Sequence, residues 1–223
     1  MDTQALLVTL RLAAVTTAIL LLIAVPLAYW IVSTRSRLRA PVEALTTLPI
    51  LLPPTVLGFY LLVLLGSRTS IGRFWVHLTG HPLAFTFTGL VIGSVIYSFP
   101  FAVQPIVAGF SSVDTALIEQ ARILGASRAR ILTGVLLPLS ARSISAAALL
   151  CFTHTVGEFG VVLMVGGDIP GATRTLSIAI YDQVQDFAYS AANRTALLLV
   201  LISVTSLIIL YAWRGAYAGA RHE

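Results

Sequence analysis

The chain has 223 residues, of which 57% are hydrophobic and only 10% are charged. A soluble domain of this size would lack the polar surface needed to cover itself, so the composition excludes a soluble globular protein and predicts an integral membrane protein. The net charge of +5 comes from arginines that are too dispersed along the chain to indicate nucleic-acid binding.

Long uncharged stretches predict where the chain crosses the membrane. A helix needs about 20 residues to cross a bilayer, and five stretches reach or approach that length, the fourth interrupted only by Glu158. We therefore expect one all-α membrane domain, residues 1–223, with five spans. The expected spans are about 8–34, 44–67, 83–111, 142–167 and 195–213. The first is too long for the hydrophobic region of a signal peptide and no cleavage site follows it, so we expect it to be retained.

The second and third of these spans each contain more than one proline. The second has Pro49, Pro53 and Pro54, and the third has Pro100 and Pro105. Each removes a helix hydrogen bond and kinks its helix, which is tolerated in a membrane where neighbouring helices or a cavity satisfy the freed carbonyls. Kinked spans suit a pathway that opens and closes, although prolines are also commoner in membrane helices in general.

The segment 114–138, between the third and fourth spans, is polar and carries three arginines. Asp114 can cap a short helix, Gly125 stands where a left-handed residue would end it, and Ser127 can cap a second short helix. The apolar positions of the first helix are Leu117, Ile118, Ala121 and Leu124. Periodicity alone favours a helix on the membrane surface.

A second polar stretch, residues 168–194, separates the last two spans. It contains Pro170 and Gly171 and one short apolar piece, 175–181. It predicts an external lid or a re-entrant helix, and a short sixth span is the alternative.

The positions of the arginines predict an orientation with the N-terminus outside and the C-terminus inside, because nine arginines then lie on the inner side and five on the outer side. The inner nine are Arg35, Arg37, Arg39, Arg122, Arg128, Arg130, Arg142, Arg214 and Arg221. Segment 114–138 then faces the cytoplasm.

All 14 basic residues are arginine, and the chain contains no lysine. A Walker A phosphate loop needs its lysine, so the chain cannot hydrolyse ATP by that route. The single cysteine, Cys151, excludes an intrachain disulfide and is expected to be a small core residue.

No constellation of residues indicates enzymatic chemistry, and we expect no catalytic or metal-binding residues. His154 and Glu158 are four residues apart, hence on one face of a continuous helix, which is the geometry of a proton relay. A metal would need further ligands that no motif supplies. We favour a structural role in which Glu158 stabilises a break at Gly157 and Gly160 through hydrogen bonds.

Within segment 114–138 the order is Glu119-Gln120-Ala121, three residues, Gly125, nine residues, Val135, one residue, and Leu137-Pro138. This spacing resembles the EAA signature of bacterial ABC importer permeases throughout. Gln120 in place of an alanine and Val135 in place of an isoleucine are mild departures. Three further blocks resemble the permease subunit of molybdate importers: LPILLPPTVLG at 48–58, GEFG at 157–160 and IPGATRT at 169–175.

The resemblance implies a type I ABC importer permease fold in a bacterial inner membrane, with a cytoplasmic coupling helix. Glu119, Gln120, Ala121 and Gly125 would dock in a cleft of an ABC ATPase, present in two copies, and Leu137-Pro138 would join this helix to the fourth span. ATP and Mg would be bound by that partner and no cofactor by this chain. A second copy of the chain would enclose the path, and an external oxyanion-binding protein would deliver molybdate. Sulfate and tungstate are the alternative substrates.

Within this interpretation the hydroxyls of Ser145, Thr153 and Thr155 are candidates to line the path, and Gly157 and Glu158 are candidates for a gate. The alternative for the hydroxyls is hydrogen bonding within their own helix. Two further candidates, Asp168 and Arg174, would contact the binding protein. The rival function is a proton-coupled secondary transporter that uses His154 and Glu158, but the chain lacks the internal repeat of many such carriers.

Overall fold

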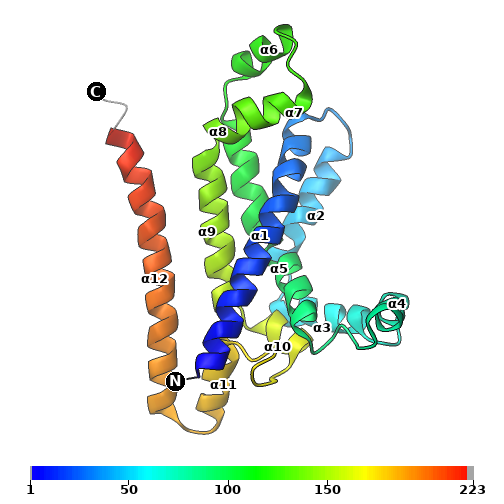
Figure 1. Cartoon of the computed structure of the whole chain (residues 1–223), viewed down its shortest axis with the longest axis vertical. Coiled ribbons are helices and arrows are strands. Elements are labelled where there is room, and N and C mark those ends of the chain that lie inside the picture. Colours follow the sequence, from blue (N-terminus) through cyan, green and yellow to red (C-terminus); the bar gives the residue numbers. More distant parts are fainter. Residues whose placement is uncertain (1, 220–223) are drawn as a thin grey trace.

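Three helices form the centre of the molecule. The computed structural model describes residues 2–219, and its core consists of α1 (Thr3–Ser33), α5 (Phe87–Ser111) and α9 (Ala141–Gly157), packed together along the bundle (Figure 1). Their sequences are apolar over most of their length, as a helix that faces lipid on one side and protein on the other requires. The all-α class is thereby confirmed for the described residues.

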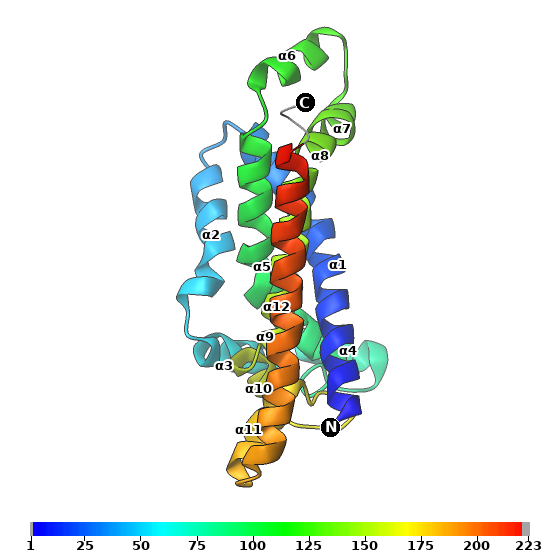
Figure 2. The ribbon, with the colours of Figure 1, turned by 90° about the vertical axis from the view of Figure 1, so that its left-hand side faces the viewer.

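Two further helices flank this centre. α12 (Tyr189–Gly219) runs beside α9, and α2 (Arg39–Leu51) packs against α5 (Figure 2). Because α1 and α12 begin at the same end of the bundle and run in the same direction, the N-terminus and the end of α12 lie at opposite ends (Figure 1). Arg221, which we counted among the inner arginines, lies outside the described residues.

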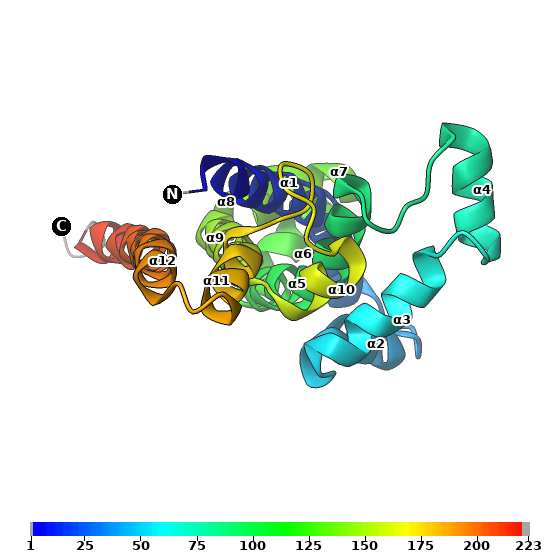
Figure 3. The same ribbon diagram turned by 90° about the horizontal axis from the view of Figure 1, so that it is seen from below.

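Short helices occupy both ends of the bundle. The end that holds the N-terminus, called here the N-terminal end, carries α3 (Pro54–Leu65), α4 (Ser70–Thr79), α10 (Gly160–Gly166) and α11 (Leu176–Gln185) (Figure 3). The opposite end, called here the elbow end, carries α6 (Thr115–Ile123), α7 (Arg128–Ile131), the π-helical turn η1 (Leu132–Leu136) and α8 (Leu137–Leu139) (Figure 1).

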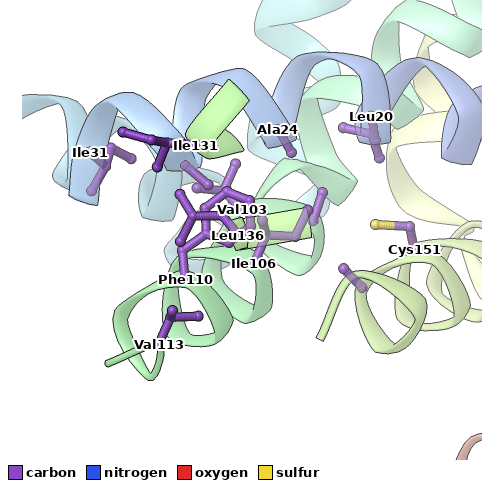
Figure 4. Packing of buried hydrophobic residues seen from close by; sticks show 13 residues of the cluster. Leu20, Ala24, Ile31, Val103, Ile106, Phe110, Val113, Ile131, Leu136 and Cys151 are labelled. Carbon is purple, nitrogen blue, oxygen red and sulfur yellow. The ribbon is translucent and has the colours of Figure 1, made fainter. Parts of the chain in front are cut away.

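One cluster of buried side chains joins the three central helices. Its members include Leu20 and Ala24 of α1, Val103, Ile106 and Phe110 of α5, and Cys151 of α9 (Figure 4). The prediction that Cys151 is a core residue is confirmed, since the side chain is fully buried. Ile131 and Leu136 of segment 114–138 insert into the same cluster and fix the base of that segment to the bundle.

The second predicted span, 44–67, is not one helix. The chain leaves α2 at Leu52 with extended backbone, and α3 continues at 110° to α2. Pro53 explains the break, because proline has no N–H to donate and forces the preceding residue out of helical conformation. The expected kink is therefore a complete break.

The fourth predicted span, 142–167, is also interrupted. α9 ends at Gly157, Glu158 has extended backbone, and α10 begins at Gly160. Glycine is a poor helix former, so the two glycines weaken the helix on both sides of Glu158.

The two interrupted segments pack against each other at the N-terminal end, where α3 contacts α10. A Cβ atom added at Gly160 would lie 2.7 Å from Cβ of Pro54, and one added at Gly58 would lie 2.8 Å from Cβ of Met164. Only glycine at these two positions lets the backbones approach so closely.

Three described helices are long and apolar enough to cross a membrane alone: Thr3–Ser33, Phe87–Ser111 and Tyr189–Ile209. The number rises to five if each of two bent pairs counts as one span, 39–51 with 54–65 and 128–139 with 141–157.

α11 does not add a sixth complete crossing. Its ten residues are about 15 Å long, half of the hydrocarbon thickness of a bilayer. It packs against α12, and the N–H of Leu176 donates to Oγ1 of Thr9 at 2.9 Å.

We expect Gly109→Ala to lower the unfolding midpoint of the purified protein. An added Cβ would overlap the Cβ of Ser143 and lie 2.5 Å from its Oγ, where α5 packs against α9. Overfilling a close contact typically costs about 1–3 kcal/mol. The control is Gly134→Ala, because no atom lies within 4 Å of the added Cβ there. Thermal unfolding in detergent measures both, and an unchanged midpoint for Gly109→Ala would contradict the packing.

Candidate functional site

Segment 114–138 folds as two short helices joined at a left-handed glycine. Oδ1 of Asp114 accepts from the N–H of Ala116 at 2.9 Å, and Oγ of Ser127 accepts from the N–H of Arg130 at 3.3 Å. Gly125 has φ +80°, where a Cβ would be strained. Both predicted caps and the predicted left-handed glycine are confirmed.

The corner at Gly125 is a defined motif and not a flexible loop. The N–H of Gly125 donates to the carbonyl of Arg122, and the N–H of Ala126 donates to the carbonyl of Ala121, both at 2.9 Å. These two bonds form a Schellman motif, which satisfies carbonyls left free at the end of α6. The angle between α6 and the next turn is therefore set by hydrogen bonds.

The tip of the segment is exposed, whereas its base is buried. α6 contains no buried residue, and Glu119, Gln120 and Gly125 are exposed. Ala121 is half-buried, because it packs together with Ile118 against the central cluster.

Ile123 and Leu124 are 85% and 86% exposed. The predicted apolar stripe is therefore divided between an inward and an outward face. Ile123 was missed from the sequence, although its position beside Leu124 and immediately before the glycine corner was a usable signal.

Leu137 and Pro138 form the joint between the segment and α9. Proline cannot donate to the carbonyl four residues earlier, that of Gly134, which helps to account for the wider π turn over Leu132–Leu136. Leu137 is half-buried against the central cluster, and Pro138 is exposed.

The three hydroxyls predicted to line a path have different environments. Ser145 donates to the carbonyl of Ala141 at 2.9 Å, so the alternative of bonding within its own helix is confirmed for this residue. Thr155 is buried, with its Oγ1 3.2 Å from Oγ of Ser98 on α5. Thr153 has no hydrogen-bond partner for its hydroxyl and lines a pocket.

This pocket has a volume of about 620 Å³ and lies at the N-terminal end, between α3, α5, α9 and α10. Its lining residues are Pro54, Thr55, Tyr97, Thr153, His154, Gly157, Phe159, Gly160, Leu163 and Met164. The structure therefore brings Thr153 and Gly157 together, whereas Ser145, Thr155 and Glu158 do not line this pocket. No acidic side chain and no arginine lines it.

His154 and Glu158 do not share a helix face, so that prediction is wrong. α9 ends at Gly157, which places Glu158 on extended backbone. The Nδ1 atom of His154 instead lies 2.9 Å from Oγ of Ser98. Its ring stacks on the ring of Phe101, with 4.1 Å between the ring centroids.

Glu158 is only 4% exposed, and neither carboxylate oxygen has a hydrogen-bond partner in the structure. The carboxylate therefore does not stabilise the break through hydrogen bonds, whereas the backbone N–H of Glu158 donates to the carbonyl of Thr155 at 3.3 Å. Ser94, on α5, is its polar neighbour, but the serine hydroxyl is also without a partner. Unsatisfied buried polar groups are rare in proteins, which makes this break an unusual place in the bundle.

The predicted pair Asp168 and Arg174 lies together at the N-terminal end. Nη2 of Arg174 donates to Oδ2 of Asp168 at 2.7 Å, and the same nitrogen lies 3.2 Å from Oδ2 of Asp182. Asp182 was missed from the sequence, because the turn between Arg174 and α11 gives the two residues no regular spacing. These three residues line a pocket with a volume of about 360 Å³, and Asp2 and Asp186 also line it.

The two carboxyl groups bound to Arg174 titrate differently. Hydrogen bonds from Arg174 lower the pKa of Asp168. The pKa of Asp182 is raised to about 6, mainly by burial and secondly by its interaction with the neighbouring Asp168. Asp182 therefore carries a proton at mildly acidic pH and loses it near neutrality.

We expect Asp182→Asn to remove a pH dependence of stability. The folded protein binds more protons than the unfolded chain between pH about 4 and 6, so wild-type stability falls as pH rises through this window. The variant has no carboxyl group at this position and does not lose this stability. The difference in unfolding midpoint, variant minus wild type, should therefore increase from pH 4 to pH 7. Asp186→Asn is the control, since Asp186 is exposed and not part of these ion pairs. A difference that does not change with pH would contradict the assignment.

Comparison with known proteins agrees with this geometry. Residues 20–218 match the family model described as "Binding-protein-dependent transport system inner membrane component". The molybdenum transport system permease protein ModB of Azotobacter vinelandii is 45% identical over 218 residues, which are 98% of this chain and 96% of that protein. The protein of the same name from Escherichia coli K12 is 32% identical over 207 residues, which are 92% of this chain and 90% of that protein.

Solved structures show the same fold at low sequence identity. A bacterial ABC transporter that imports the acidic polysaccharide alginate has a chain that matches with a TM-score of 0.74 at 19% identity, covering 96% of this chain and 78% of that one. The MetNI methionine ABC transporter in an inward-facing conformation matches with a TM-score of 0.73 at 19% identity, covering 95% of each chain. Together with the family model, these similarities show that the chain is a membrane permease of the binding-protein-dependent transport system inner membrane component family.

Proposed function

We propose that this chain is the permease subunit of an ATP-driven importer that carries molybdate. The observation that carries the proposal is the similarity, over nearly the whole chain, to permeases named for molybdenum transport. The chain lacks the lysine of a Walker A phosphate loop, so ATP hydrolysis is assigned to a partner subunit in this proposal.

Five membrane crossings suit the arrangement of the helices. The two bent pairs each cross once in this proposal, and an odd number of crossings places the N-terminus and the end of α12 on opposite sides. Seven arginines cluster near the elbow end, between residues 35 and 39 and between 122 and 142, which supports placing that end in the cytoplasm of a bacterial inner membrane.

The exposed tip of segment 114–138 is the proposed docking surface for a cytoplasmic ABC ATPase, two copies of which would bind ATP and Mg. Glu119, Gln120, Ala121 and Gly125 would enter a cleft of that ATPase. A push on the tip would reach the bundle because Ile131 and Leu136 are buried among α1, α5 and α9. Leu137 and Pro138 would pass the displacement to α9.

The translocation path is proposed to form where a second copy of the chain faces the pocket of about 620 Å³. Thr153 lines this pocket and has a buried hydroxyl without a hydrogen-bond partner, and Gly157 stands at the end of α9. A lining without charges would let an oxyanion pass without holding it tightly. The interrupted segments around Pro53 and Glu158 are the proposed gate, and Ser145 and Thr155 support helix packing instead of lining the path.

The ion pairs of Arg174 are proposed to contact the external binding protein. Asp168 and Asp182 hold the arginine in place at the N-terminal end, which faces outward in this proposal. The acidic rim of this pocket would attract a basic side chain of a partner protein more readily than a free oxyanion.

Gly125→Asp should abolish uptake while membrane insertion stays intact. The site has open space for a Cβ, but φ +80° is unfavourable for a non-glycine residue, and the new carboxylate would stand at the docking surface. Uptake of molybdate in cells, with the membrane level of the permease measured in parallel, tests this expectation.

The matched control is Gly134→Asp, an exposed glycine of the same segment without a positive φ and with nothing near its added Cβ. It should retain most uptake. Wild-type uptake by Gly125→Asp would show that the corner does not dock an ATPase in the proposed way.

The substrate is tested with the reconstituted complex of permease, ATPase and binding protein. ATP hydrolysis should rise when the binding protein carries molybdate, and collapse of a proton gradient should leave uptake unchanged. Stimulation by sulfate and not by molybdate would overturn the substrate assignment. Uptake that requires the proton gradient and no ATPase would favour a secondary transporter instead.

A further inference from the structure

A pocket of about 260 Å³ lies at the elbow end, between the end of α1 and segment 114–138. Its lining residues are Tyr29, Trp30, Ser33, Thr34, Arg35, Arg122 and Arg128. The proposed function does not use it. The pocket and its charges are independent of which substrate the protein carries.

Three arginines from two separate parts of the chain face this pocket, and no carboxylate lines it. Arg35 follows α1, Arg122 lies in the last turn of α6, and Arg128 begins α7. Among the described residues, none of the three forms an ion pair. Positive charges held around one pocket repel each other unless an anion lies between them.

The other lining residues suit an anion at a membrane surface. The guanidinium groups present forked donors that match the oxygens of a tetrahedral oxyanion, and the hydroxyls of Tyr29 and Thr34 are further donors. The hydroxyl of Ser33 already donates to the carbonyl of Trp30 at 3.4 Å. Oγ1 of Thr34 already accepts from the N–H of Ser36 at 3.1 Å, which leaves its own O–H to donate. Trp30 and Tyr29 are of the aromatic types enriched at the boundary between bilayer and water.

We propose that this pocket binds a tetrahedral oxyanion of the phosphate type. The anion comes either from the headgroup of an anionic membrane lipid or from free anion in solution, since basic pockets at the ends of membrane helices suit both sources. Because the three arginines belong to different elements, the bound anion joins the end of α1 to both helices of segment 114–138. It thereby stabilises one position of that segment relative to the bundle.

The first experiment measures binding of free anion to the full-length protein in nanodiscs of phosphatidylcholine alone. Titration with inorganic phosphate should change the fluorescence of Trp30, and Trp30→Phe separates this signal from that of Trp75 and Trp213. Arg35→Gln and Arg128→Gln should each weaken binding about tenfold, the factor equal to 1.4 kcal/mol. Arg37→Gln is the matched control, because Arg37 is an exposed arginine at the same end that does not line the pocket.

The second experiment uses nanodiscs that contain phosphatidylglycerol. Native mass spectrometry counts the phosphatidylglycerol retained by wild type and by each variant, and phosphate titration is repeated in these discs. Retention of phosphatidylglycerol that is lost in Arg35→Gln and Arg128→Gln identifies a lipid headgroup as the source. Phosphate binding that phosphatidylglycerol does not displace identifies free anion.

Either result supports the pocket, whichever source it identifies. Wild-type protein that binds neither inorganic phosphate nor phosphatidylglycerol would overturn the proposal, as expected if the arginines serve only to meet acidic side chains of a partner protein. An effect of Arg37→Gln equal to that of the pocket variants would also overturn it, because general surface charge would then explain the binding.

Discussion

Backbone N–H and C=O groups inside a bilayer must find partners within the protein, and the rest of this structure depends on how that constraint is met. Helices satisfy it over most of the chain. Two apolar segments nevertheless leave the helix, at Leu52-Pro53 and at Glu158-Phe159. The structure accommodates both interruptions by packing α3 against α10, where Gly58 and Gly160 leave room for the opposite chain.

The interruption at Glu158 buries polar groups at a greater cost in free energy than the interruption at Pro53. A proline explains the first, whereas the second places a carboxylate among buried groups with no hydrogen-bond partner. Such groups cost free energy, and they persist where the surrounding packing determines the conformation. The pocket beside this interruption is lined by the end of α9 and by α10, so a change in the interruption would alter the pocket directly.

The elbow end combines a rigid corner, an exposed tip and a buried base. The Schellman hydrogen bonds at Gly125 fix the corner, and Ile131 and Leu136 are buried among the three central helices. Force applied at the tip therefore reaches packed side chains without first bending a flexible loop. The arginine-lined pocket lies between this segment and α1, which places a cluster of positive charge at the contact that such a movement would change.

The sequence by itself determined the features that depend on local chemistry. Asp114, Gly125 and Ser127 act as predicted because capping and left-handed backbone are decided within a few residues. Membrane insertion followed from composition, and the family followed from the spacing of the residues from Glu119 to Pro138.

Only the tertiary structure decided where the predicted spans break and which side chains meet. His154 and Glu158 do not share a helix face because α9 ends at Gly157, before Glu158. Arg174 forms an ion pair with Asp182 across the turn that precedes α11. The hydroxyl of Ser145 bonds within its own helix, whereas the hydroxyl of Thr155 contacts Ser98 on α5. Contacts between distant segments depend on the relative placement of helices, which local patterns do not contain.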